Sequence, residues 1–247
     1  MKLFKLILFF VLTLLLIRIS PVVGQDIPKG LEDKGPLTKK TFIHYRKKAN
    51  PAKPPSAGGN KLIQCYGFLA NAAKWKTTED YIVNDTNSGN SHNFVLNTVN
   101  EGIAEWETYG GGKIFGIGVP DKSAPYNPNT VDGRNVVAFG YYGDPDVIAV
   151  TTVWGYFSGP PQTRELVEWD MLFNTGTFSF GINNNPDIPV MDLQNIATHE
   201  LGHSAGMDDV YSTSCTLETE YGYSDYGEII KRDLHNADIA GIKKLYR

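Results

Sequence analysis

The spacing of apolar residues changes along the chain, and each change predicts a different element. Between residues 167 and 173, the apolar side chains Val167, Trp169, Met171 and Phe173 stand at every second position, which predicts a strand. Four other short runs are rich in β-branched and aromatic residues, which strands favour. We predict strands in these runs, which are residues 75–84, 113–119, 136–142 and 147–154.

A helix is predicted between the strands at residues 75–84 and 113–119. Val95, Val99, Ile103 and Trp106 recur at helical spacing and so lie on one face. Consecutive glycines that begin at Gly110 then end the helix.

A second helix is predicted after Asp192, whose short carboxylate suits an N-cap. Leu193, Ala197, Leu201 and Ala205 follow it as an i, i+4 apolar stripe for the core. Strands and helices in this order predict an α+β domain built in layers.

The second predicted helix carries His199, Glu200 and His203 in the pattern His-Glu-x-x-His. Residues four apart lie one above the other on a helix, so both imidazoles point at one spot. Two neutral imidazoles that converge in this way suit zinc, and the Glu between them can reach a metal-bound water. The short pattern also arises by chance, but burying these polar groups without a partner would be costly.

Gly206 follows His203 at a spacing that allows the helix to end. Glycine adopts the left-handed conformation of a helix terminus without a Cβ clash. The chain can then turn back and present a third ligand, and Asp209 stands at the spacing where that ligand is expected.

The extended pattern, from His199 to Asp209, resembles that of the metzincin zinc peptidases of the matrixin-like kind. In this variant an aspartate replaces the third histidine, as in snapalysin-type and prokaryotic matrixin-like proteins. The lead-in residues 190–198 and the closing residues 238–246 are also similar to matrixin segments. The resemblance covers the chain from about Cys65 onward. It implies a twisted sheet of about five strands with three helices, including the active-site helix and a C-terminal helix below the cleft.

The resemblance further implies that residues 147–154 form a sheet edge beside the metal. An extended peptide substrate can add to such an edge through main-chain hydrogen bonds. Considered from the residues alone, an ordinary interior strand is an equal alternative.

One position departs from the family pattern. Metzincins place a methionine in a turn beneath the metal, and in the matrixin-like proteins a Tyr-Gly-Tyr-Ser segment follows it. That segment is present as residues 221–224, but Glu220 precedes it. A buried carboxylate needs a partner, so we expect Glu220 to pair with a cation or polar backbone and leave the water site open. The alternative is that it caps the metal.

The N-terminus predicts a signal peptide at residues 1–24. Lys2 and Lys5 precede an apolar run of about a dozen residues, and small residues follow it near Gln25. A membrane anchor is the alternative, but spanning needs roughly 20 apolar residues. We therefore expect a secreted, extracellular protein with no stable membrane span.

Residues 25–61 are charged and rich in Pro and Gly. We predict a flexible tether or a short pro-segment of unknown effect, and a peptidase domain over residues 62–247. The only histidine of the segment, His44, has no partner at ligand spacing.

The chain contains two cysteines, Cys65 and Cys215. In an exported protein an even pair favours a disulfide, which would stabilise the fold by roughly 2–4 kcal/mol. The alternative is a Cys65 thiolate that blocks zinc in a latent form.

Composition excludes some partners. The formal net charge of −4 carries no basic excess, so nucleic acid is not expected as a partner. Calcium is possible but unsupported, because the loop carboxylates do not follow a calcium-loop pattern. These carboxylates are Asp121, Asp132, Asp144 and Asp146.

These features predict an exported zinc-dependent endopeptidase acting on protein or peptide substrates. His199, His203 and Asp209 would hold one catalytic Zn²⁺, and Glu200 would take a proton from the zinc-bound water and pass it to the leaving amine. Two alternatives stay open: a zinc hydrolase of narrow specificity, and a catalytically inactive binding or adhesion module. The oligomeric state is open too.

Overall fold

The computed structural model describes residues 34–47 and 64–247. The predicted signal peptide lies outside the described residues, as does most of the predicted tether. None of the helices within the described ranges is long and apolar enough to cross a membrane.

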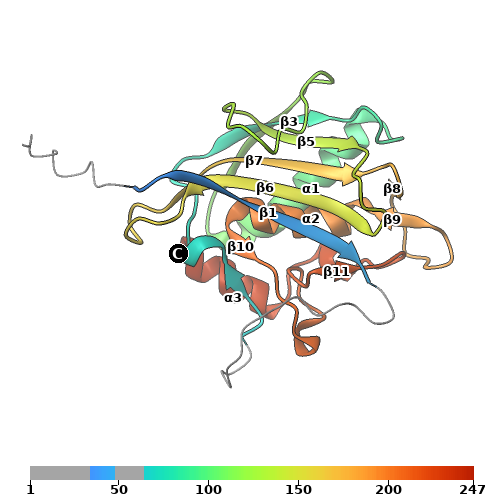
Figure 1. The fold of residues 1–247 in the computed structure, drawn as a ribbon. Helices are drawn as coiled ribbons and strands as arrows, with labels where there is room; N and C mark the ends of the chain where they lie inside the picture. Colours follow the sequence, from blue (N-terminus) through green and yellow to red (C-terminus); the bar gives the residue numbers. More distant parts are fainter. Residues whose placement is uncertain (1–33, 48–63) are drawn as a thin grey trace, which may run out of the picture. The chain divides into compact units, whose positions relative to one another are not determined.

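A mixed seven-stranded sheet forms the upper layer of the molecule (Figure 1). Its strand order is β11-β1-β6-β7-β5-β3-β4. Each of the five predicted runs overlaps one of its strands, because these runs carry local β-rich patterns. The five are β3 (Glu79–Asn84), β4 (Phe115–Pro120), β5 (Asn135–Gly140), β6 (Val147–Tyr156) and β7 (Glu165–Asn174).

Two strands at one side of this sheet were not predicted. They are β1 (Leu37–Arg46) and β11 (Tyr223–Ser224). The expected sheet of about five strands therefore has two additional members. β1 also corrects the expectation of a tether: residues 37–46 form a strand of the domain, because their main chain pairs along β6 and two of their side chains are buried.

The strand β1 changes the position of β6. β6 lies between β1 and β7 in the sheet, so it is not a free edge, and the expectation drawn for residues 147–154 is wrong. β1 runs antiparallel to β6 from Leu37 opposite Tyr156 to Tyr45 opposite Val147, with a register shift between His44 and Tyr45.

Three α-helices lie beneath the sheet (Figure 1). They are α1 (His92–Gly110), α2 (Leu193–Ala205) and α3 (Asn236–Tyr246). An α+β fold with three helices is thus present, as the resemblance implied. The smaller elements are β2 (Gly67–Phe68) with β10 (Met207–Asp208), β8 (Ser179–Gly181) with β9 (Val190–Asp192), and the 3₁₀ turns η1 (Leu69–Asn71), η2 (Thr213–Cys215) and η3 (Ile230–Arg232).

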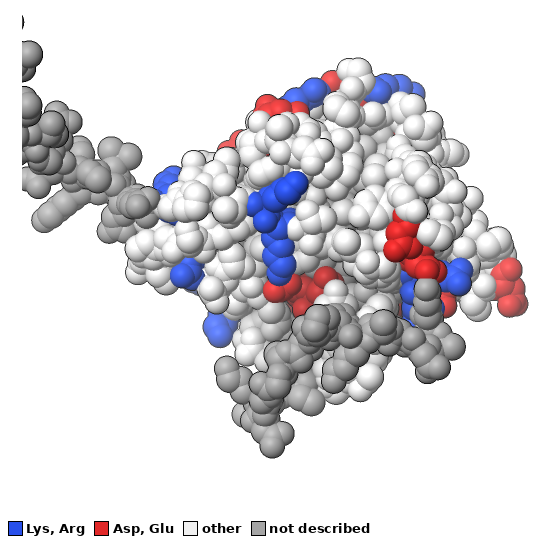
Figure 2. Space-filling view, viewed as in Figure 1, with Lys and Arg blue, Asp and Glu red and all other residues white. Residues whose placement is uncertain are grey.

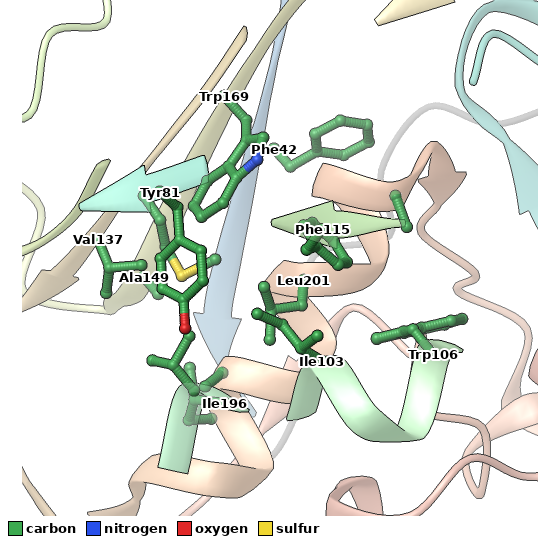
Figure 3. Packing of buried hydrophobic residues seen from close by; sticks show 14 of the residues in the cluster. Phe42, Tyr81, Ile103, Trp106, Phe115, Val137, Ala149, Trp169, Ile196 and Leu201 are labelled. Atoms are coloured by element: carbon green, nitrogen blue, oxygen red, sulfur yellow. The ribbon is translucent and has the colours of Figure 1, made fainter. Parts of the chain in front are cut away.

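The core between sheet and helices positions α2. Ile196 and Leu201 of α2 point toward the large buried side chains of α1 and the sheet (Figure 3). Trp106 of α1 is fully buried, and its Nε1–H donates to the carbonyl oxygen of Thr198 at 2.7 Å. This bond sets the position of α2 along α1. It therefore also positions the polar side chains that α2 carries.

Cys65 and Cys215 form the expected disulfide, with the sulfurs 1.99 Å apart. It joins the start of the second described range to η2, 150 residues later. The segment after the predicted ligand Asp209 is therefore covalently anchored.

Candidate metal centre

Helix α2 begins and ends where its sequence predicts. The Asp192 carboxylate accepts a hydrogen bond from Asn195 N at 2.9 Å and is paired with Arg232. At the other end, Gly206 has φ of 101° and closes the helix as its C-cap. On the helix between them, the His199 and His203 rings lie 4.8 Å apart.

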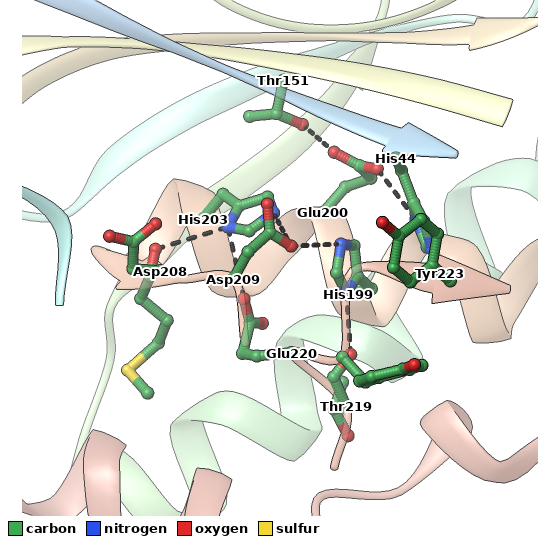
Figure 4. Close-up of polar contacts among 12 residues, drawn as sticks. His44, Thr151, His199, Glu200, His203, Asp208, Asp209, Thr219, Glu220 and Tyr223 are labelled. Carbon is green, nitrogen blue, oxygen red and sulfur yellow. Dashed lines mark hydrogen bonds and ion pairs between the residues drawn. The ribbon is translucent and has the colours of Figure 1, made fainter. Parts of the chain in front are cut away.

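Asp209 completes a triangle of donor atoms with these rings (Figure 4). Its Oδ1 lies 3.5 Å from Nε2 of His199 and 3.5 Å from Nε2 of His203. Ligands about 2.0–2.1 Å from a tetrahedral zinc lie about 3.3–3.4 Å from one another, so the two distances from Oδ1 fit. Moreover, His199 Nε2 and Asp209 Oδ1 are buried and have no hydrogen-bond partner among the described residues. Buried polar atoms need partners, and a metal cation between them would be one.

The other nitrogen of each ring is already engaged. His199 Nδ1 donates to Thr219 O at 2.7 Å, and His203 Nδ1 lies 3.3 Å from Met207 O. With the proton on Nδ1, the lone pair of each Nε2 points into the triangle, which is the tautomer that a metal requires. Sequence reasoning missed Thr219, because only the folded chain brings its carbonyl beneath α2.

Negative charge surrounds His203. Burial lowers its pKa, but the carboxylates of Glu220 and Asp209 outweigh burial and raise it to about 10. Burial, by contrast, holds the pKa of His199 well below its usual value. A cation in the triangle would offset the carboxylate charge and leave both imidazoles neutral.

Glu200 stands beside the triangle and is fully buried. Its Oε2 accepts a hydrogen bond of 2.5 Å from the hydroxyl of Thr151 on β6, and its Oε1 lies 3.2 Å from Nδ1 of His44 on β1. Burial raises the pKa of Glu200 to about 7. A carboxyl group with this pKa can take up and release a proton near neutral pH.

Glu220 lies on the lower side of α2, away from the triangle (Figure 4). Its Oε2 is 3.2 Å from His203 Nδ1, and both oxygens lack a hydrogen-bond partner within the described ranges. Burial raises its pKa well above the usual range. We predicted that Glu220 pairs with a cation or a polar group. In the structure it contacts Nδ1 of His203, the nitrogen that faces away from Asp209.

Gly202 makes the room that Glu220 occupies. A Cβ atom at position 202 would lie 1.8 Å from Glu220 Oε1 and 2.5 Å from Trp106 Cζ2. Only a residue without a Cβ fits between these two neighbours.

Two further donor sets converge around α2 in the described part of the chain. They are His44 with His199 and Glu200, and His199 with His203 and Glu220. The first set needs the Glu200 oxygens, which contact Thr151 and His44, and the second needs His203 Nδ1, which faces Met207 O, whereas two of the three triangle atoms have no partner. We therefore favour the triangle.

β1 brings two residues over the site that sequence reasoning did not assign to it. The Phe42 ring stacks on His203 at 3.8 Å, and the His44 ring lies 3.9 Å from His199. His44 was judged to have no partner at ligand spacing. Its partner Glu200 is 156 residues away in the chain, so no local pattern could indicate the pair.

Comparison with known families bears on this arrangement. The matrixin family model matches residues 174–247, which contain α2, Asp209, Glu220 and α3. The match supports a matrixin-like metzincin assignment. At a coarse level it also suggests a zinc metallopeptidase that acts on protein substrates. No curated protein matches the chain.

Proposed function

We propose that the protein is an exported zinc-dependent endopeptidase whose metal is held by His199, His203 and Asp209. The observation that carries this proposal is the position of Asp209 Oδ1, which lies 3.5 Å from Nε2 of His199 and 3.5 Å from Nε2 of His203, while two of these three atoms are buried without partners. The matrixin match and the disulfide support the same assignment and an extracellular location.

Zinc held in this triangle would act as a Lewis acid and bring the pKa of a bound water to near 7. The protein's own contribution is to orient the ligands and to move a proton. Thr219 and Met207 fix the two imidazoles through Nδ1, which keeps both Nε2 lone pairs on the metal side.

Glu200 is the proton carrier of the proposal. Thr151 contacts its Oε2 and His44 contacts its Oε1, and the carboxylate so oriented would accept a proton from the attacking water and return it to the leaving amine. Burial raises the pKa of Glu200, which makes the carboxylate a better proton acceptor.

The experiment combines metal analysis with a hydrolysis assay. The full chain is expressed, and its zinc content and hydrolysis of casein and gelatin are measured before and after treatment with a chelator. We expect about one zinc per chain, loss of hydrolysis on chelation and recovery on adding zinc back. Protein that takes up no zinc contradicts the proposal. Protein that binds zinc without hydrolysing any substrate favours the binding-module alternative.

A further inference from the structure

Lys231, in the turn η3, is a lysine inside the protein. On the face drawn in Figure 2, basic side chains stand at the surface. Lys231 is 0% exposed, and it is the only buried lysine or arginine among the described residues. Taking an ammonium group out of water is costly unless acceptors surround it. Its burial therefore needs a reason beyond the packing of η3.

The acceptors around the Lys231 ammonium are mostly neutral. It donates to the carbonyl oxygens of Tyr221 and Tyr223, and it lies 2.8 Å from Ser224 Oγ. Its ion pair with Glu228 spans 3.8 Å, which is too long for a hydrogen bond. A neutral donor could serve the two carbonyls at a lower desolvation cost. The positive charge itself therefore points to a further partner.

The backbone around Lys231 is anchored to the ligand helix α2. The Lys231 N–H donates to Asn195 Oδ1 at 2.8 Å, and the next residue, Arg232, pairs with the N-cap carboxylate of Asp192. The position of the ammonium is thus fixed relative to the helix that carries Glu200.

His44 lies between this ammonium and Glu200. Its Nε2 is 3.3 Å from Lys231 Nζ, and its Nδ1 is 3.2 Å from Glu200 Oε1, a contact that Figure 4 shows. An ammonium group has only donors, so Nε2 can face it only as an acceptor. The single proton of a neutral imidazole then stands on Nδ1, from which it is donated to the carboxylate.

A proton on Nε2 is the alternative, since this nitrogen also lies 3.1 Å from Ser224 Oγ. If Nε2 carried the only proton, the lone pair of Nδ1 would face an ionised Glu200, and two acceptors would meet. If both nitrogens were protonated, an imidazolium would lie 3.3 Å from a buried ammonium, and like charges at this distance repel. The surroundings therefore favour the proton on Nδ1.

We propose that Lys231 and His44 are positioning residues for Glu200: the buried ammonium places the His44 proton on Nδ1, and this N–H holds the carboxylate in the orientation that proton transfer requires. This inference rests on the proposed function. Thr151 donates to Oε2, so Glu200 is held through both oxygens. Each oxygen keeps a second lone pair that can accept the proton of a water.

The first measurement identifies the ring nitrogen of His44 that carries the proton. Zinc-loaded full chain with ¹⁵N-labelled histidine is studied by NMR at one neutral pH, as wild type and as Lys231→Met. The His44 signals are those missing from the spectrum of His44→Asn. Wild type should have the proton on Nδ1 and none on Nε2, and Lys231→Met should lose this preference. A wild-type proton on Nε2, or the same tautomer in both forms, would overturn the proposal.

The second measurement compares two replacements of His44. The amide nitrogen of asparagine is bonded to Cγ, as Nδ1 is, so His44→Asn keeps a donor for Glu200, whereas His44→Leu has none. We expect His44→Leu to lower kcat for labelled casein about tenfold with KM and zinc content retained, and His44→Asn to stay within about threefold of wild type. Equal losses in the two variants would show that His44 only fills space, and an unchanged kcat in His44→Leu would show that it has no part. Either result overturns the proposal.

The controls separate this inference from folding and from the proposed function. Thr41→Ala, on the exposed side of the same strand, should behave as wild type, and thermal unfolding establishes that each form is folded. If Lys231→Met does not fold, the wild-type tautomer and the two His44 variants decide. If zinc-loaded wild type hydrolyses no casein, the enzyme assignment fails, while NMR still decides whether Lys231 directs the His44 proton to Glu200.

Discussion

The two sides of helix α2 supply different kinds of contact to the candidate site. From the sheet side, Thr151 and His44 reach Glu200 through their side chains. From below, Thr219 reaches the ligand His199 through a backbone carbonyl. The upper hydrogen bonds thus act on the proposed proton carrier and the lower one acts on a metal ligand, while the Phe42 and His44 rings also pack on the ligand imidazoles from above.

The lower side is fixed more firmly than the upper side. Asp238 of α3 is fully buried and accepts hydrogen bonds from the backbone N–H groups of Thr219, Glu220 and His235. The upper side includes β1, whose contribution depends on two side chains and on sheet pairing. The ligands are thus held largely by backbone contacts from below, and the proton carrier by side chains from the sheet.

The largest effect is expected from Glu200→Ala, on the upper side. Loss of the proton carrier should lower hydrolysis by about 10²–10⁴-fold, while zinc content and the fold are retained. Zinc analysis and the casein assay measure both. If the variant keeps nearly normal turnover, Glu200 has no part in the mechanism.

Asp209→Ala tests the ligand triangle between the two sides. Removing its carboxylate should weaken zinc binding by about 100-fold or more. Loss of a residue that only hydrogen-bonds to a metal ligand already costs up to about that much, and a direct ligand should cost at least the same. Asp208→Ala is the matched control, because its carboxylate pairs with Lys40 instead. Dialysis against graded chelator, followed by metal analysis, gives the two affinities. The reverse order would identify Asp208 as the ligand.

Asp238→Ala tests the lower side. The three backbone N–H groups that it serves would lose their acceptor, so we expect a loss of about 2–3 kcal/mol in the free energy of unfolding. Zinc affinity should also fall, because Thr219 would no longer hold His199 in place. Denaturant unfolding of this variant is compared with that of Asp233→Ala, an exposed aspartate nearby. Equal stability of the two variants would show that Asp238 does not hold the lower side together.

The smallest effect is expected from Glu220→Met. Methionine has a similar length, and the carboxylate that it replaces contacts only the far nitrogen of His203. We expect retained zinc and equal or up to roughly fivefold higher peptidase activity, given that an unsatisfied buried carboxylate is costly. A change from an inactive parent to a strongly active variant would instead identify Glu220 as the group that blocks the site.

The parts of the fold that local patterns encode could be predicted. Asp192 and Gly206 mark the ends of α2 through capping chemistry that depends only on neighbouring residues. The strands β3 to β7 follow from runs of β-branched and aromatic residues in the same way. For the site, the motif brought His199, Glu200 and His203 together on one helix face.

The remaining features depend on contacts between distant segments. β1 was missed because Lys39, Lys40 and Arg46 give it the composition of a solvated segment, and its strand partners lie more than a hundred residues away. Thr151 and Asp238 were missed for the same reason, since each acts on a residue of another element. Thr41, Phe42, Ile43 and Tyr45 are β-branched or aromatic and were a local signal for a strand, but this run is short and lies between basic residues.

Gly202 has a consequence for how freely the zinc motif can vary. Its neighbours on the lower side, Glu220 and Trp106, come from two separate elements and both exclude a Cβ atom. Shortening Glu220 would remove one obstacle and leave the indole of Trp106 in place. If the two inner positions of His-Glu-x-x-His were randomised in a library and selected for folded, zinc-binding protein, glycine would return at 202 even in a background carrying a smaller residue at 220. The second x of this motif is therefore a determined position in this protein.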